Sequence, residues 1–197
     1  QTDVGWCLRS RVLQPQVGDE GWELGEPGPV VELAGGAGRH HLWPALARDA
    51  DGSLLLVWQE LHGDTMTIRG RVHAAGSGWG PEFAVSTPGP SAWAPSLTAV
   101  SPGRFAVVWD AAVDGDFDVL LARVAVTSDG EAQVQAPRRV TDDGRFQAHA
   151  SVAAAGERLY VAYEVGPENW GREGSQDKID VALHNVRDVE ILRTGAA

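Results

Sequence analysis

LLLVW at residues 54–58, FAVVW at 105–109 and LYVAY at 159–163 decide the fold of this chain. The aromatic residues that end these three runs lie 51 and 54 residues apart. A short, continuous run of aliphatic and β-branched residues, bounded by Gly, Asp or Pro, is typical of a buried β-strand. The sequence therefore predicts a repeat of about fifty residues, with one buried strand in each copy.

Each repeat contains three further segments with the character of strands. A run of small residues precedes the buried strand, an alternating run follows it, and a short run ends the repeat. Arg71 and Arg123 end alternating runs that we match to each other. No segment has the 3.6-residue periodicity of an amphipathic helix, so we predict an all-β protein. The segments are PALA (44–47), PSLTAV (95–100) and ASVAAA (150–155); TMTIRGRV (65–72), FDVLLARV (117–124) and KIDVALHNV (178–186); and EFAVS (82–86), RRVT (138–141) and VEILRT (189–194).

Four-stranded antiparallel units of this length predict the blades of a β-propeller, in which sheets stack face to face. Residues 1–38 supply the last two strands of one blade, and 39–89, 90–143 and 144–197 supply one blade each. The last blade carries a long loop at 165–178. The chain thus contains about three and a half blades, whereas closed propellers have roughly four to eight. We expect the ring to be completed by sequence outside this chain, by a second copy, or not at all.

The composition limits the partners of this chain. Its net charge of −11, from 27 acidic and 16 basic residues, makes nucleic acid and anionic lipid poor partners. No apolar run approaches the roughly 20 residues that span a membrane. Cys7 is the only cysteine, so no internal disulfide forms. We expect the partner to be a carbohydrate, another small ligand or a neighbouring domain of the same parent chain, in the periplasm or outside the cell.

Polar residues follow the repeated aromatic residue in every unit, namely Gln59 with Glu60, Asp110 and Glu164. Because equivalent strands of a propeller end at the same side, we expect these side chains on one rim of the channel, with His149 beside them. Converging carboxylates at a rim bind ligands, or act as general acids and bases. Carboxylates at strand ends near solvent are also common without a function, so both interpretations stay open.

The loop at 165–178 offers Trp170 beside Asn169. An exposed aromatic ring with polar neighbours suits stacking against a sugar or docking of a partner. Long loops on a rigid scaffold often carry function. The alternative is a lid folded over the propeller face, or a contact to a following domain.

Asp114, Asp116 and Asp118 alternate in the segment DGDFD, and such carboxylates can ligate Ca²⁺ through their oxygens. The full EF-hand pattern is absent, and the alternative is a turn in which these carboxylates bond to nearby backbone N–H groups. Beyond calcium we expect no cofactor. The sequence contains neither a GxSxG nucleophile motif nor a GxxxxGK(S/T) phosphate loop.

Four stretches carry a resemblance to known propellers: Pro44 to Trp58, GDFDV (115–119), FQAHASV (146–152) and YEVGPENWG (163–171). They resemble blades of large exported bacterial proteins in which a propeller precedes a domain similar to metal-dependent PHP-type phosphoesterases. The resemblance implies that the catalytic metal site lies in that following domain. It assigns no catalytic residue to this chain.

The blade pattern is also similar to that of sialidase-type propellers, whose Asp-box has the form S/T-x-D-x-G-x-x-W. Here Asp51 and Gly52 are followed by Trp58 six residues after the glycine, and no arginine triad can be assigned. The similarity therefore covers the blades and not the Asp-box.

These observations predict a non-catalytic propeller repeat module that acts as a binding or scaffold domain in a larger exported bacterial protein. The alternative is a fragment of a sialidase-like glycoside hydrolase or of a phosphoester hydrolase, in which Asp110 and Glu164 act as acid and base. A third hypothesis is a self-assembling module, in which two copies complete one ring.

Overall fold

The computed structural model of the protein describes residues 5–18, 21–74, 76–167 and 188–195. Regular secondary structure in this part of the chain consists of β-strands, with no helix. None of it forms a helix long and apolar enough to cross a membrane. The prediction of an all-β protein is therefore confirmed for the described residues.

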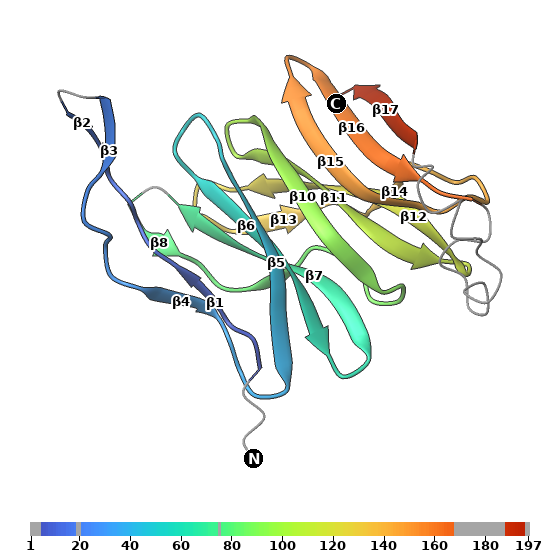
Figure 1. Cartoon of the computed structure of the whole chain (residues 1–197), viewed down its shortest axis with the longest axis horizontal. Coiled ribbons are helices and arrows are strands. Elements are labelled where there is room, and N and C mark those ends of the chain that lie inside the picture. Colours follow the sequence, from blue (N-terminus) through green and yellow to red (C-terminus); the bar gives the residue numbers. More distant parts are fainter. Residues whose placement is uncertain (1–4, 19–20, 75, 168–187, 196–197) are drawn as a thin grey trace.

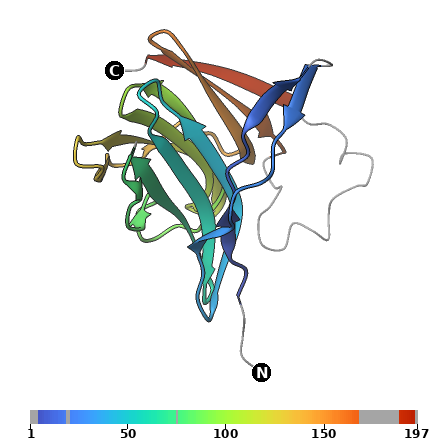
Figure 2. The same ribbon diagram turned by 90° about the vertical axis from the view of Figure 1, so that its left-hand side faces the viewer.

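The strands form antiparallel sheets that follow one another in sequence order, and Figures 1 and 2 show them fanned out side by side. We call the three larger ones the first, second and third sheet. The first sheet contains β5 (Arg39–Arg48), β6 (Leu54–His62), β7 (Thr65–Ala74), β8 (Gly78–Trp79) and β9 (Phe83–Ala84). The second contains β10 (Ala92–Ser101), β11 (Arg104–Val113), β12 (Asp116–Val126), β13 (Ala132–Val134) and β14 (Arg138–Arg139). The third contains β15 (Gln147–Ala155), β16 (Arg158–Val165) and β17 (Asp188–Gly195).

Two short strand pairs precede the first sheet. β1 (Leu8–Ser10) pairs with β4 (Val31–Ala34), and β2 (Pro15–Gly18) pairs with β3 (Gly21–Leu24) in a hairpin between them. In the first and second sheets, the third strand pairs with two short strands, one after the other, and these two strands together take the position of a fourth strand. The antiparallel four-strand plan of a propeller blade is thus visible in the first and second sheets.

The middle strands of the first and second sheets, β6 and β11, are buried on both faces, which explains their continuous apolar sequence; along β16, buried and partly exposed residues alternate. In β11, Phe105, Val107 and Trp109 pack toward the first sheet, while Ala106 and Val108 pack toward the third. The alternation follows from the period of two in a β-strand. The aromatic residue that ends each run packs against the structure before it. Trp58 packs with Leu8 and Leu33, Trp109 with Leu55 and Val57, and Tyr163 with Ala106 and Val108.

Each first strand is interrupted by a β-bulge at the same position. The bulged residue has a positive φ although it is not glycine: 53° at Trp43, 45° at Ala94 and 55° at His149. Such a conformation costs roughly 1–3 kcal/mol for a residue with a side chain, so the surrounding structure must compensate for it. The bulge is therefore a repeated structural feature of these sheets.

Two of the expected strand matches are wrong. The strand beside β16 is β17, at 188–195, whereas the sequence predicted 178–186 at this place; the latter segment lies outside the described residues. The match of Arg71 with Arg123 is displaced by one residue. When Trp58 is superposed on Trp109 in the strand register, Arg123 corresponds to Val72. A shift of one residue moves a side chain to the opposite face of a sheet.

Truncation of Trp109 tests the stacking of the sheets. Because its side chain is buried between the first and second sheets, with 1% exposure, we expect Trp109→Ala to lower the free energy of unfolding by about 3–5 kcal/mol. Trp6→Ala removes the same ring from a site that is 68% exposed, and we expect a change within about 0.5 kcal/mol. Urea unfolding measures both. Equal losses in the two variants would contradict the burial of the repeated aromatic residue.

Candidate functional site

The polar residues predicted for one rim occupy equivalent positions in the three sheets. Each follows the aromatic residue of a middle strand and lies opposite the residue that comes just before a bulge. The pairs are Gln59 with Leu42, Asp110 with Trp93 and Glu164 with Ala148. The structure therefore places these three side chains at the same end of their sheets.

Two of these side chains hold the bulge of the following sheet. Gln59 Oε1 accepts the backbone N–H of Ala94, with an N–O distance of 3.1 Å. Asp110 Oδ2 accepts the N–H of His149 at 2.9 Å, and its Oδ1 lies 3.5 Å from the nitrogen of Ala150. A bulge leaves a backbone N–H outside the strand ladder, and a buried N–H needs an acceptor. Gln59 and Asp110 supply that acceptor and join successive sheets.

The carboxyl group of Asp110 has a raised pKa. Burial raises the pKa of Asp110 to about 6, although the backbone N–H groups of His149 and Ala150 lower it. A carboxyl group that titrates near neutrality is suited to proton transfer. However, the side chain is almost fully buried and its oxygens already accept backbone N–H groups. This arrangement favours a structural role.

Asp110, His149 and Glu164 form one connected group between the second and third sheets. The backbone N–H of His149 reaches Asp110, and its ring Nδ1 lies 3.0 Å from Glu164 Oε2. The side chain of His149 is half exposed, and that of Glu164 is partly exposed. The structure thus brings together the three rim residues that the sequence predicted around this junction.

A row of aromatic rings lies at the same end of these sheets and was not predicted. Trp93, opposite Asp110, is in contact with Phe117, with 5.1 Å between ring centroids. Phe117 in turn contacts Phe146, at 5.2 Å. All three rings are half-buried. The signal in the sequence was an aromatic residue at or just before the start of a strand: Trp93 in β10, Phe117 in β12 and Phe146 directly before β15.

Glu60 lines a separate pocket of about 330 Å³ on the first sheet. The pocket is polar: besides Glu60 it is lined by Arg39, His62, Thr65, Thr67 and Arg69. The side chain of Glu60 is only 7% exposed, and its Oε2 lies 3.6 Å from Arg39 Nη1. The sequence analysis named Glu60 as a ligand residue but missed its neighbours.

Glu60 receives no hydrogen bond from its nearest neighbour, His41. Trp58 Nε1 donates to His41 Nδ1 at 3.0 Å, so this nitrogen carries no proton. Burial lowers the pKa of His41 despite the raising effect of Glu60, which keeps the ring neutral. Glu60 Oε2 and Arg69 Nε are buried without a hydrogen-bond partner among the described residues. Such atoms call for a polar ligand or water.

The second sheet has apolar residues at the positions of His41, Glu60 and Arg69, although it has Asp116 and Asp118 at those of Thr65 and Thr67. In the strand register, the positions of His41, Glu60 and Arg69 correspond to Ala92, Ala111 and Leu120 in the second sheet. The blade fold therefore does not require charged residues there. Comparison of the repeats position by position is the signal that finds this site in the sequence.

The three acids of the predicted calcium loop are not gathered around a common point. Asp118 is fully buried, where it bonds to Arg139 and accepts the Thr141 hydroxyl at 3.1 Å. Arg139 also lies 3.6 Å from the exposed Asp114, and Asp116 Oδ1 accepts the N–H of its neighbour Phe117. Burial raises the pKa of Asp118, and Arg139 opposes this shift. Within the described residues no three His, Cys, Asp or Glu side chains are grouped to hold a metal, and the calcium prediction remains untested by binding.

Two further predicted residues, Asn169 and Trp170, lie outside the described residues.

Comparisons with solved structures identify the class of fold. No family model and no curated protein matches the sequence. A sialidase from Trypanosoma rangeli in complex with the inhibitor DANA is similar, with a TM-score of 0.53 and 10% identity over 94% of this chain and 33% of that one. The Hadza microbial sialidase Hz136 gives 0.50 and 12% over 75% and 40%. At these identities the likeness concerns the fold alone.

The chain therefore has a sialidase-like β-propeller fold. It spans between one third and two fifths of the length of these two sialidases, so it is a partial propeller by comparison with them. The expected connection to a PHP-type domain is not addressed by these comparisons and stays an expectation.

Asp110→Asn tests the ionisation of the buried rim acid. The pKa of Asp110 is about 6 in the folded protein against an ordinary 3.8. The folded protein thus binds this proton more tightly than the unfolded chain, and ionisation lowers the free energy of unfolding as the pH rises from about 4 to about 6. Asparagine keeps an acceptor oxygen, as Gln59 does, and does not ionise. We expect the variant to gain up to about 3 kcal/mol relative to wild type between pH 4 and pH 8.

Urea unfolding at the two pH values measures this difference. Asp142→Asn, at an exposed carboxylate, is the matched control and should follow the wild type at both pH values. A difference between Asp110→Asn and wild type that does not change with pH would show that Asp110 is not the titrating group.

Proposed function

We propose that this chain is a non-catalytic binding and scaffold module of propeller type, part of a larger exported protein. The observation that supports this is the use of Gln59 and Asp110, which accept backbone N–H groups of the next sheet at equivalent positions. The neutral amide of Gln59 and the carboxyl group of Asp110 both accept a backbone N–H at this position. Neither proton transfer nor charge is needed for it, which argues against an acid–base role for this row of residues.

The Glu60 pocket is the binding site that we propose. Glu60 Oε2 needs a donor, while Arg39 and Arg69 offer donors to an acceptor. A hydroxyl group both donates and accepts hydrogen bonds. A small carbohydrate, or another small molecule rich in hydroxyl groups, therefore fits the chemistry of this pocket.

A hydrolase fragment is the alternative, and one observation favours it. Asp110, with a pKa of about 6, is linked through His149 to the partly exposed Glu164. Such a pair resembles the acid and base of a hydrolase of glycosides or phosphoesters. Turnover measurements therefore belong in the test of the proposed function.

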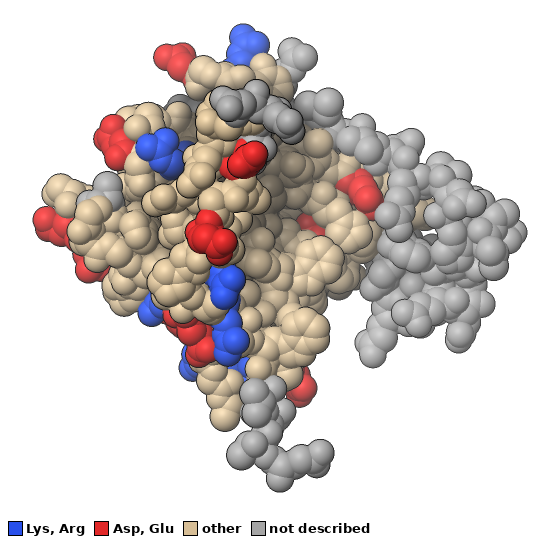
Figure 3. All heavy atoms as spheres, turned by 60° about the vertical axis from the view of Figure 1, so that its left-hand side comes forward, with Lys and Arg blue, Asp and Glu red and all other residues tan. Residues whose placement is uncertain are grey.

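The scaffold role rests on the N-terminal strands. In Figure 3 the described surface on the side of these strands is mostly uncharged, with acidic and basic residues interspersed. The β1–β4 pair contributes the last strands of a blade, and we propose that strands from a neighbouring segment or from a second copy complete it. Nine large hydrophobic residues between positions 6 and 46 are exposed: Trp6, Val12, Leu13, Val17, Leu24, Val30, Val31, Trp43 and Leu46.

Binding to the Glu60 pocket is tested with galactose, xylose and N-acetylneuraminic acid by isothermal titration calorimetry. We expect at least one sugar to bind, and Glu60→Ala to weaken it by about tenfold or more, because a charge-assisted hydrogen bond is lost. This variant should fold, since Ala111 occupies the same position in the second sheet. Glu131→Ala, at an exposed site, is the control and should bind as wild type does.

The same protein is assayed with p-nitrophenyl glycosides, a methylumbelliferyl sialoside and p-nitrophenyl phosphate. We expect no turnover above the blank. Turnover that Asp110→Asn abolishes would replace our proposal with the hydrolase alternative, and absence of binding by all three sugars would exclude carbohydrate as the ligand.

Sedimentation distinguishes the two ways of completing the β1–β4 blade. If a second copy supplies the missing strands, the chain sediments as a dimer at micromolar concentration, and Val17→Glu on the exposed hairpin weakens the dimer. A strict monomer at all concentrations excludes self-association and leaves a neighbouring segment as the partner.

A further inference from the structure

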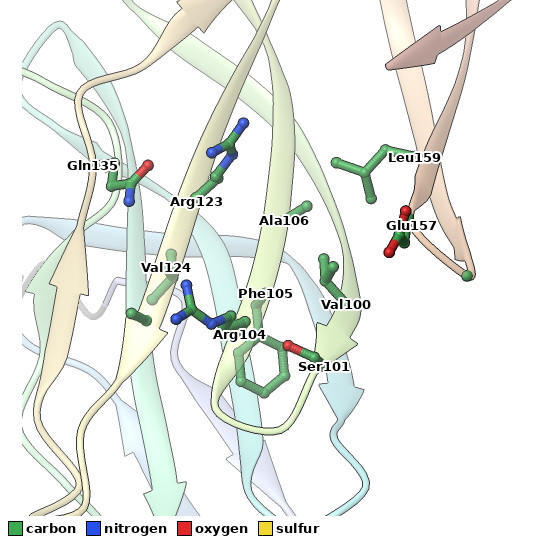
Figure 4. Close-up of a pocket in the computed structure, with 12 residues that line it drawn as sticks. Val100, Ser101, Arg104, Phe105, Ala106, Arg123, Val124, Gln135, Glu157 and Leu159 are labelled. Atoms are coloured by element: carbon green, nitrogen blue, oxygen red, sulfur yellow. The ribbon is translucent and has the colours of Figure 1, made fainter. Parts of the chain in front are cut away.

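A cleft of about 460 Å³ lies between the second and third sheets, at the end of the sheets opposite the rim acids. Figure 4 shows Arg104 and Arg123 on two adjacent strands of the second sheet, with Leu159 and Glu157 across the cleft on the third sheet. Val100, Ala106 and Leu159 belong to the apolar core between the two sheets. The cleft therefore combines two positive charges with an apolar floor.

The two arginines face the same way. Arg123 lies opposite Ala106, and Arg104 stands two residues before Ala106 on the same strand. Because Ala106 packs toward the third sheet, both arginine side chains start from the face that borders the cleft. The two arginines are diagonal neighbours on this face; Arg104 is exposed and Arg123 is half-buried.

Neither arginine has a carboxylate partner among the described side chains. Other arginines of this acidic protein do pair with one within 4 Å: Arg9, Arg39, Arg69, Arg139 and Arg145. Arg11, Arg48, Arg71, Arg138 and Arg158 also lack such a partner in the described part of the chain. What distinguishes Arg104 and Arg123 is that they line the same cleft from adjacent strands, where both guanidinium groups can reach one external anion.

The first sheet lacks these charges, whereas the third sheet has Arg158 and Arg193 at the same two register positions. In the strand register, Arg104 corresponds to Ser53, and Arg123 to Val72. Val72 is buried in the core between the first and second sheets, with 3% exposure. A valine closes that junction, and an arginine stands at the same place where the next junction is open.

The turns at this end of the sheets also differ between the two junctions. At the first, Asp49 Oδ2 accepts the N–H of Gly103 at 2.7 Å and ties the turn of the first sheet to that of the second. At the second junction the corresponding turns, at Ser101 and at Gly156, border the cleft instead. The junction is held at the rim by Asp110 and opens toward this end.

We propose that this cleft binds a small oxyanion with an apolar body, such as a phosphate ester or an aromatic carboxylate. The guanidinium groups of Arg104 and Arg123 bind the anion, because their planar donors match the oxygens of a phosphate or carboxylate. The apolar body rests on Val100, Ala106 and Leu159. Glu157 is exposed across the cleft and remains solvated. This site is independent of the Glu60 pocket.

The experiment uses phenyl phosphate, benzoate and inorganic phosphate as probes, measured by isothermal titration calorimetry in a phosphate-free buffer of low ionic strength. We expect phenyl phosphate to bind saturably and more tightly than inorganic phosphate, because only the former covers the apolar floor. Arg123→Gln should weaken its binding by about tenfold or more. Arg48→Gln removes one charge from an exposed site on the first sheet and should leave the affinity within about twofold.

A second variant guards against a loss of folding. Arg123→Val restores the residue of the first junction, so it should fold, close the cleft and abolish binding. Circular dichroism verifies the fold of each variant. The proposal is overturned if none of the three probes binds saturably, if Arg48→Gln weakens binding as much as Arg123→Gln, or if Arg123→Val retains full affinity.

Discussion

The bulged backbone N–H groups in the first strands of the second and third sheets are the constraint on which the stacking of these sheets depends. A residue with positive φ, such as Ala94 or His149, turns its N–H out of the strand ladder. That group is then buried between sheets and must find an acceptor there. Gln59 and Asp110 provide it from the preceding sheet. The polar residues after Trp58 and Trp109 are thus fixed by the fold, and each tryptophan itself packs into the opposite junction.

In a repeat protein, this constraint helps to distinguish polar residues that the fold requires from polar residues that serve a function. A polar position that recurs in every sheet, as Gln59 and Asp110 do, serves the contact between sheets. A polar position that is apolar in the equivalent place elsewhere serves no general need of the fold. Glu60, whose counterparts are Ala111 and Val165, belongs to this second kind. Burying or crowding charge lowers stability, so such residues point to ligands.

The sequence predicted the repeats, the middle strands and the propeller class, because these follow from a periodic pattern of burial. It did not predict the partners of the rim residues, since a contact between sheets joins residues 35 to 40 positions apart, as in Gln59 with Ala94 and Asp110 with Ala150. The acidic loop was similarly ambiguous: Asp118 has its partner in Arg139, on a short fourth strand. The sequence matched Arg71 with Arg123 because both residues are arginines near the end of a strand. In the structure their side chains lie on opposite faces of their sheets.

The two junctions between the three sheets differ at one end only, and this difference explains where a ligand can enter. At the rim, both junctions are held by the same type of contact, in which a side-chain oxygen accepts the backbone N–H of a bulged residue. At the far end the first junction is closed by Asp49 and by Val72, whereas the second has arginines in place of the small and apolar residues. Sheets that are joined at one end and spread at the other form a wedge. A wedge with arginines on one wall and apolar side chains at its floor favours an anion with an apolar body over a compact one, because only such a molecule contacts both the arginines and the apolar residues.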